Sequence, residues 1–331
     1  MKSILKNIIV KLAYRYGFEI KRRSILKLGL SPCIFEEINL RPSEYPPEFD
    51  MAVYGKIHLE LSGKSKPKLQ QHYASFGRAE GWRANELENR QDFANLISQD
   101  IRSLEIGPFV NPLLSGKYVD YADYLSTEEL IVRAQQIGLD PSNIPPIKYI
   151  LKDISLGNIT EQYDAVLTSH CIEHQPDLIE HLIQVQRLVE KNRGRYFVLV
   201  PDKRFCFDRH IADSTIADVI DAHENKRTLH PLKSIIEHRA LTTHNDSISH
   251  WLDGGVQTPQ KISLERVQSA IEEWRLANGQ YIDVHAWYFT PESFVEIIIL
   301  LNRLGYISFT VERLYPSRLN SNEFWAILKA H

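Results

Sequence analysis

The chain has 331 residues, of which 43% are apolar and 24% charged, and its net charge at pH 7 is −3. This composition excludes a disordered chain, because enough apolar surface is present to offset the entropy lost on folding. The negative net charge argues against nucleic acid as a partner, since nucleic-acid-binding proteins usually carry a basic excess. The three cysteines, Cys33, Cys171 and Cys206, are spaced too widely for a disulfide framework or a structural zinc site.

Residues 1–45 are expected to form a basic N-terminal arm and a linker. Residues 1–30 contain eight lysines and arginines and a single acidic residue, Glu19. Lys6 and Lys11 interrupt the apolar positions, so no run approaches the roughly 20 residues needed to span a bilayer, and no signal-peptide cleavage site follows. The sequence therefore predicts a cytoplasmic protein whose arm is suited to peripheral association with the anionic inner membrane.

Residues 46–95 are expected to form a small helical module. The segment begins beside three prolines at positions 42, 46 and 47, which mark a linker, and contains the string HYASFGRAEGWR at 72–83. This string resembles a helical module found beside glycosyltransferase and methyltransferase domains in bacterial surface-polysaccharide proteins. Taken alone, its aromatic residues predict a mini-core, with Gly77 and Gly81 closing helices in left-handed turns.

From residue 96 onward, short apolar runs alternate with helical periodicity, which is typical of βαβ units and a parallel sheet. The pattern predicts an α/β fold, in which a Rossmann-like, mainly parallel sheet with a terminal antiparallel strand follows the small helical module. An insertion is expected at about 211–290. The expected strands are 103–106, 117–121, 148–151, 165–168, 196–200, 307–314 and 323–328, and the expected helices are 127–137, 176–190 and 295–304, the last capped by Thr290 and Pro291.

The loop after the first expected strand is the first candidate ligand site, because sheets of this type bind ligands at the carboxyl ends of their strands. It reads LEIGPFVNP at 104–112, and Gly107 lets the backbone pass close to a ligand. A dinucleotide would require G-x-G-x-x-G, so the single glycine argues against NAD and FAD. Glu105 at the strand end is suited to complement a positively charged ligand.

Two acidic residues, Asp120 and Asp123, are candidates for the end of the second strand. A carboxylate there can accept hydrogen bonds from both hydroxyls of a ribose. Either residue could instead be a helix N-cap or a turn residue.

The LEIGPFVNP loop and the segment YDAVLTSHCIEH at 163–174 together resemble class I S-adenosylmethionine-dependent methyltransferases, in particular a bacterial group whose first loop reads LEIGP…NP. The resemblance covers about 100–331 and implies that residues 96–331 form a methyltransferase domain with S-adenosylmethionine as cofactor. It favours Asp120 over Asp123 for the ribose and implies that Asp153 bonds the adenine amino group. The cofactor-binding residues it implies are Glu105, Gly107, Pro108, Phe109, Asn111, Asp120, Asp153, Ile154, Ser169 and His170.

The polar segment VPDKRFCFDRH at 200–210 is expected to hold the methyl acceptor. Methylation of a hydroxyl needs a base within hydrogen-bond reach, and His210 and Asp208 are the candidates for this catalytic role. The alternative is that Asp208 and Arg209 form a surface pair and that His210 is solvated. The expected substrate-binding residues are Arg204 and Arg209 here, and His285 and Trp287 where the insertion rejoins the sheet and an indole face could stack on a sugar.

The insertion is rich in histidine, with six at positions 223, 230, 238, 244, 250 and 285, but none of them form an H-x-x-x-H or H-E-x-x-H pair on one expected helix. The sequence therefore predicts no metal site.

The function expected from these features is methyl transfer to an acceptor, namely a hydroxyl of a bacterial surface-glycan sugar or of a lipid-linked precursor. The prediction of this acceptor is based on the resemblance of the helical module and on the basic arm. Two alternatives remain open. One is methylation of another small molecule, and the other is a binding or scaffold protein that kept the fold and lost catalysis, as the single-glycine loop allows.

Overall fold

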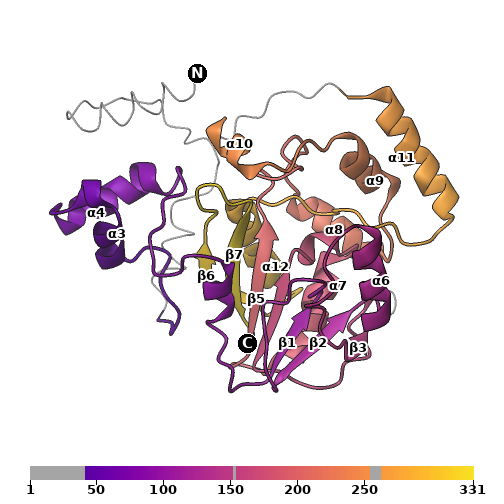
Figure 1. Cartoon of the computed structure of the whole chain (residues 1–331), viewed down its shortest axis with the longest axis horizontal. Coiled ribbons are helices and arrows are strands. Elements are labelled where there is room, and N and C mark those ends of the chain that lie inside the picture. The colour runs from indigo at the N-terminus through magenta and orange to yellow at the C-terminus, as the bar shows by residue number, and fades with distance from the viewer. Residues whose placement is uncertain (1–41, 152–153, 254–261) are drawn as a thin grey trace.

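The computed structural model describes residues 42–151, 154–253 and 262–331, so most of the basic arm at 1–45 and the candidate Asp153 lie outside the described residues. A seven-stranded sheet in the order β3-β2-β1-β4-β5-β7-β6 forms the centre (Figure 1). Neighbouring strands from β3 to β5 are parallel, whereas β7 is antiparallel to both β5 and β6. The predicted Rossmann-like, mainly parallel α/β fold is confirmed. The strands are β1 (Ser103–Ile106), β2 (Val119–Asp123), β3 (Tyr149–Ile150), β4 (Ala165–Ser169), β5 (Arg195–Pro201), β6 (Thr310–Tyr315) and β7 (Glu323–Lys329).

The position of β2 differs from the prediction in a way that affects the candidate site. The strand begins and ends two residues later than expected, because the chain first turns at Gly116, whose φ of 124° is suited to glycine. Asp120 consequently lies near the start of β2, opposite Leu104, and Asp123 is its last residue.

The strand order reverses between β1 and β4. The chain proceeds from β1 outward to β2 and β3 on one side, then crosses to β4 on the other side of β1. Such a switch point leaves a crevice at the carboxyl ends of the two central strands, where ligands bind in open α/β sheets. The sheet therefore places the loops after β1 and β4 next to each other.

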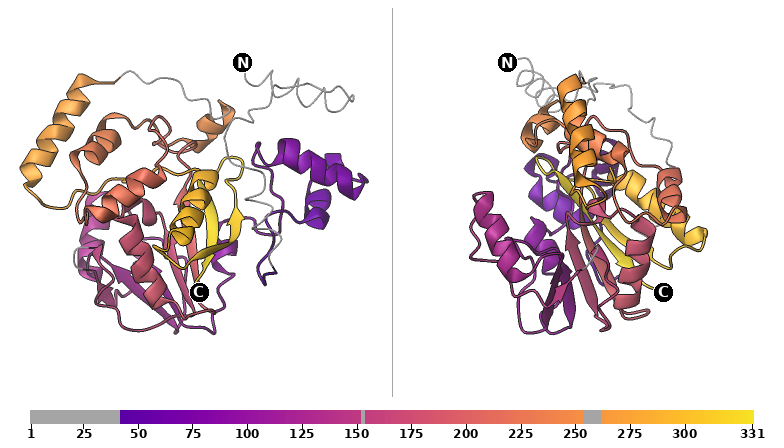
Figure 2. Two further views of the ribbon diagram at one scale, coloured as in Figure 1. Left: turned by 180° about the vertical axis from the view of Figure 1, so that it is seen from behind. Right: turned by 90° about the vertical axis from the view of Figure 1, so that its right-hand side faces the viewer.

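One face of the sheet is covered by α7 (Leu178–Leu188), α8 (Ile216–Glu224) and α12 (Pro291–Arg303). Their apolar faces join the inward residues of β1, β4 and β5 in one large core cluster. As predicted, Thr290 caps α12, its side chain accepting a hydrogen bond from the Ser293 N–H, and Pro291 is the first helical residue. In the right-hand view of Figure 2 the sheet has helices on both sides.

The opposite face is covered in part by residues from before the sheet. No helix lies between β1 and β2, where residues 107–118 are all described. Residues 87–97, which include α5 (Arg90–Ala94), pack there instead. Phe93 is fully buried against Phe197 and Trp325, with ring centroids 5.6 and 5.4 Å away. The last turn of the expected helical module is thus part of the sheet's own core. A further helix, α6 (Thr127–Gln136), begins with a capping box at Ser126.

The rest of the module has its own small core, built from α3 (Met51–Ile57), the short turn η1 (Leu59–Leu61), α4 (Lys66–His72) and the π-helical turn η2 (Tyr73–Gly77). The predicted mini-core is present. Gly81 has the expected positive φ of 69°, but Gly77 does not close a helix in a left-handed turn. It is required for another reason, since a Cβ at Gly77 would lie 2.1 Å from the Tyr54 hydroxyl.

The expected insertion contains α8, α9 (Leu232–Ala240), α10 (Ser247–Leu252) and α11 (Leu264–Ala277). Figure 1 shows α9, α10 and α11 beyond the carboxyl end of β5. A separate apolar cluster joins α9 to α11 and to Ile282 and Val284. The insertion therefore covers the edge of the sheet at which ligands are expected. No helix in the described part of the chain is long and apolar enough to cross a membrane.

Candidate functional site

Four residues in the loops at the carboxyl edge of the sheet have a left-handed backbone conformation. Gly107 (φ 74°) and Phe109 (φ 42°) follow β1, Ile154 (φ 56°) follows β3, and His170 (φ 50°) follows β4. Bulky residues adopt this region at a cost in free energy, and residues held in it cluster at ligand-binding sites. All four were candidate cofactor contacts in the sequence. The structure places them in loops along one edge, around the switch point.

The buried side chain of Glu105 holds the loop after β1 in place. Its buried carboxylate accepts hydrogen bonds from the backbone N–H groups of Leu113 (2.9 Å) and Leu114 (2.8 Å). Burial raises the pKa of Glu105 to about 7 and outweighs these bonds, which lower it. In this structure Glu105 holds the loop, and the neighbouring candidates differ in exposure, Pro108 being buried and Asn111 exposed.

The two aspartates of β2 lie at opposite ends of the strand. Asp120 is paired with Lys148 (2.7 Å) and accepts a hydrogen bond from the Tyr163 hydroxyl (2.8 Å), in a hollow at the amino-terminal edge. Asp123 is buried at the carboxyl edge, where burial raises its pKa to about 6 against the lowering effect of the Leu125 and Phe109 N–H groups. Asp120 is therefore not brought together with the other cofactor candidates, and Asp123 is.

Ser169 and His170 at the end of β4 are held by residues that the sequence analysis did not single out. The Arg90 guanidinium donates to the Ser169 hydroxyl (2.5 Å) and to the Glu323 carboxylate (3.0 Å). The same carboxylate lies 2.8 Å from His170 Nε2 and accepts from the Trp325 indole. Arg90 comes from α5 and Glu323 from β7, so distant parts of the chain fix this loop.

Three segments converge just beyond Ser169 and His170: the turn η4 (Ile172–His174), the loop after β5, and residues 283–289. The Glu173 carbonyl accepts hydrogen bonds from the N–H groups of Ala286 (2.7 Å) and Trp287 (3.2 Å). The Phe289 carbonyl accepts from the Lys203 N–H (2.9 Å). These backbone bonds hold η4 and the loop after β5 against the segment that carries His285.

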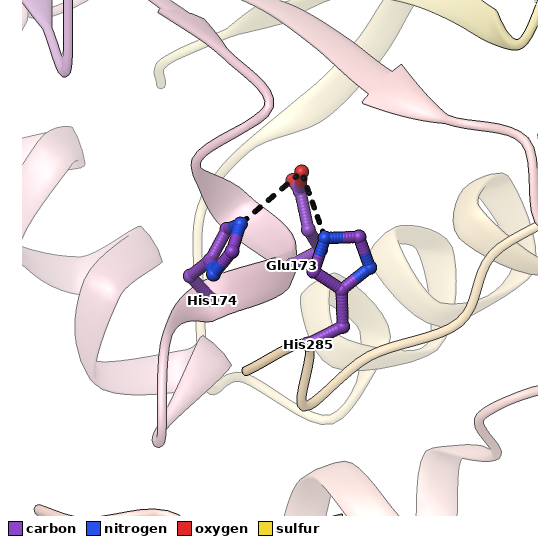
Figure 3. Close-up of side chains that lie close together, drawn as sticks. All are labelled: Glu173, His174 and His285. Atoms are coloured by element: carbon purple, nitrogen blue, oxygen red, sulfur yellow. Dashed lines mark ion pairs between the residues drawn. The ribbon is translucent and has the colours of Figure 1, made fainter. Parts of the chain in front are cut away.

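Figure 3 shows the imidazoles of His174 and His285 facing the Glu173 carboxylate. Their Nε2 atoms lie 3.8 and 3.9 Å from Glu173 Oε1. On the far side of each ring is an aspartate: Asp208 Oδ2 is 2.6 Å from His285 Nδ1, and Asp283 Oδ1 is 2.9 Å from His174 Nδ1. Burial lowers the pKa of His285 to about 3, so this ring is neutral near pH 7.

The candidate acceptor residues are mostly engaged with protein partners. Arg204 forms two hydrogen bonds to the fully buried Asp202, and Arg209 Nη1 lies 2.7 Å from His250 Nδ1. Trp287 is 2% exposed and donates to the Gln175 carbonyl (2.6 Å), so the prediction that it stacks on a sugar is wrong for this structure. The indole is part of the main core cluster of the sheet.

The two candidate bases, Asp208 and His210, lie in different environments. Asp208 is 1% exposed and bonded to His285, so it is neither a surface residue paired with Arg209 nor open to an acceptor. His210 is partly exposed, and burial together with the charge of Arg209 and Lys203 lowers its pKa. A neutral imidazole can accept a proton, so His210 retains the chemistry of a base.

Several residues of the site were missed from the sequence, namely Arg90, Glu323, Asp283 and the roles of Glu173 and His174. Arg90 and Glu323 carry no local motif, since only the sheet brings them to β4. The spacing H-x-x-x-H does occur at His170 and His174, in a segment singled out for its resemblance rather than for its ligand atoms.

No protein-family model matches the chain, and no curated protein matches it. Among solved structures, it is similar to an S-adenosylmethionine-dependent methyltransferase from Mesorhizobium loti, with 13% identity over 72% of this chain and 95% of that one and a TM-score of 0.37. A complex of DhpI with SAH has 13% identity over 91% and 98% of the chains, with a TM-score of 0.35. A protein from Rhodobacter sphaeroides described as a putative Zn-dependent alcohol dehydrogenase has 12% identity over 79% and 97%, with a TM-score of 0.38. Likenesses this low carry no conclusion about the activity of this chain.

Proposed function

We propose that the chain binds S-adenosylmethionine at the switch point between β1 and β4 and transfers its methyl group to an acceptor. The observation that carries this proposal is the row of left-handed residues, Gly107, Phe109, Ile154 and His170, along the carboxyl edge. The motifs at 104–112 and 163–174, which resemble those of class I methyltransferases, are the segments that form this edge. Motif and geometry thus point to the same place.

The residues present fit an adenosyl ligand. Asp123 supplies a buried carboxylate at the end of β2, which is suited to accept hydrogen bonds from two ribose hydroxyls. Its pKa of about 6 leaves it mainly ionised at pH 7. In the proposed arrangement Asp123 takes the role that the sequence resemblance gave to Asp120, and the loop held by Glu105 lies along the rest of the ligand. The bound cofactor would supply the electrophilic methyl group.

For the acceptor we propose a hydroxyl of a surface-glycan sugar or of a lipid-linked precursor, on the strength of the module at 46–95. His210 is the base in this proposal, because its neutral ring is partly exposed beyond β5. Methylation of another small molecule remains the alternative acceptor. A binding or scaffold role is the alternative class, which the single glycine of the first loop favours.

Two matched variants test the cofactor site, since Asp120 and Asp123 are the same residue type on one strand. Isothermal titration with S-adenosylhomocysteine should show one site in the wild type. Asp123→Asn should weaken binding by about 10- to 100-fold, or about 1–3 kcal/mol, because a charge-assisted acceptor is lost. Asp120→Asn should leave the affinity within about twofold, because its carboxylate is paired with Lys148.

Two results would contradict this proposal. Absence of any binding to the wild type would favour the scaffold alternative. If only Asp120→Asn weakened binding, the ribose would have to bind near the amino-terminal end of β2.

A further inference from the structure

Glu173 is a buried carboxylate without a hydrogen-bond partner among the described residues. Its side chain is 1% exposed, and neither Oε1 nor Oε2 accepts a hydrogen bond. A buried, uncompensated carboxylate is costly in free energy, so such a group normally has a cation or a proton donor beside it. Three histidine nitrogens, from His170, His174 and His285, lie 3.8–3.9 Å from Oε1. These distances are too long for hydrogen bonds.

The orientation of His285 explains why no hydrogen bond closes this gap. Its Nδ1 lies 2.6 Å from Asp208 Oδ2, and when Asp208 is ionised this oxygen can only accept, so that Nδ1 carries the proton. The Nε2 of the neutral ring then presents a lone pair to Glu173 Oε1 (Figure 3). Two lone pairs facing each other repel unless a cation lies between them. His174 also turns Nε2 toward Glu173, and Asp283 Oδ1 lies 2.9 Å from its Nδ1, although Nδ1 makes no hydrogen bond there.

We propose that Glu173, His174 and His285 bind a divalent transition-metal ion. The ligand atoms of these three side chains all lie within 4.8 Å of one another. Atoms bonded to one ion at about 2.0–2.2 Å lie roughly 3–4 Å apart, so a small movement of the side chains closes the site. Two imidazoles and one carboxylate select Zn²⁺, Mn²⁺, Fe²⁺ or Co²⁺ over Mg²⁺ and Ca²⁺, which prefer all-oxygen sites.

Carboxylates also lie beside the second ring nitrogens of the two proposed histidine ligands. Asp208 is hydrogen-bonded to His285 and Asp283 lies beside Nδ1 of His174, and carboxylates commonly orient metal-bound histidines through the second ring nitrogen. A second group, Asp208, His238 and His285, also has ligand atoms close together. It fits an ion less well, because His238 Nδ1 already accepts from the His285 N–H (3.0 Å) and Asp208 is at hydrogen-bond distance from His285.

The proposed site departs from the sequence expectation of no metal, and it goes beyond the proposed methyl transfer. The ligands come from η4 and the segment before α12, so the ion would lie beside the loop that carries Ser169 and His170. Three protein ligands leave coordination positions open. If the proposed function holds, the oxygen atoms of the acceptor are the ligands suited to those positions.

The test uses untagged, full-length protein stripped with a chelator, with Co²⁺ as the probe. Visible absorption should show d–d bands that saturate at one Co²⁺ per chain, and elemental analysis after Zn²⁺ loading and dialysis should give the same ratio. His174→Ala and Glu173→Gln should each weaken Co²⁺ binding by at least about 100-fold, and Asp208→Asn by about 10- to 100-fold. The matched control is His223→Ala, a partly exposed histidine on α8, which should bind as the wild type does.

Circular dichroism of every variant separates loss of ligands from loss of fold, and His174, being partly exposed, is the variant expected to fold best. Wild-type protein that binds neither Co²⁺ nor Zn²⁺ would overturn the proposal, as would ligand variants that bind like His223→Ala. Titration with S-adenosylhomocysteine in the stripped protein keeps the two proposals apart. Cofactor binding without metal binding refutes the metal site alone, and metal binding without cofactor binding refutes the proposed function alone.

Discussion

At the scale of single residues, position along a strand decides what a carboxylate does. Asp120 and Asp123 are equally acidic and three residues apart, and the sequence motif could not separate them. The structure separates them because the turn at Gly116 shifts β2 toward its carboxyl end. Residue type was thus enough to predict a carboxylate that binds ribose hydroxyls. Choosing between Asp120 and Asp123 required the strand register.

Glu105 illustrates the same limit. The sequence placed it correctly at the end of β1, but its role depends on where the following loop folds back. In the structure its carboxylate meets the N–H groups of Leu113 and Leu114, eight and nine residues later. Such medium-range bonds leave no periodic signal in a sequence.

Glu105 also predicts a pH dependence of stability. Burial raises its pKa from 4.5 to about 7, so between these pH values the native protein keeps a proton that the unfolded chain releases. The free energy of unfolding should therefore decrease as pH rises through this window, by about 3 kcal/mol from this group. Urea unfolding at several pH values measures the slope.

The variant Glu105→Gln should lack this part of the pH dependence, because its side chain does not ionise. Glu86→Gln, at an exposed position, is the control and should keep the wild-type profile. Parallel profiles for wild type and Glu105→Gln would show that Glu105 does not titrate in this range.

At the scale of elements, the sequence predicts where amphipathic helices and buried strands lie, but it does not predict which segments pack against them. The bounds of β1 and the capping of α12 follow from local patterns. The packing of residues 87–97 on the sheet does not follow from local patterns. It follows from the absence of a helix between β1 and β2, which leaves an apolar face that another segment must bury.

Phe93 tests whether residues 87–97 belong to the sheet domain. Its ring is fully buried between Phe197 and Trp325, so Phe93→Ala should lower the free energy of unfolding by about 3–5 kcal/mol. Urea unfolding followed by tryptophan fluorescence measures this loss. Leu59→Ala is the control, because Leu59 is 82% exposed and its loss should cost under about 0.5 kcal/mol. A loss below about 1 kcal/mol for Phe93→Ala would mean that the segment is peripheral.

At the scale of the whole molecule, the carboxyl edge of the sheet is assembled from widely separated segments of the described chain. The module contributes Arg90, the sheet contributes Asp123, His170 and Glu323, and the segment after α11 contributes His285. Helices α9, α10 and α11 lie over this edge (Figure 2). An edge to which such distant segments contribute polar side chains is the expected location of function.

The central claim is that this edge binds an adenosyl ligand, and a crystal structure of the protein with S-adenosylhomocysteine tests it most directly. The expected result is a ligand between the loops after β1 and β4, with its ribose hydroxyls within hydrogen-bond distance of Asp123. A ligand bound instead beside Asp120 and Lys148, or no ligand in crystals grown at saturating concentration, would contradict the claim.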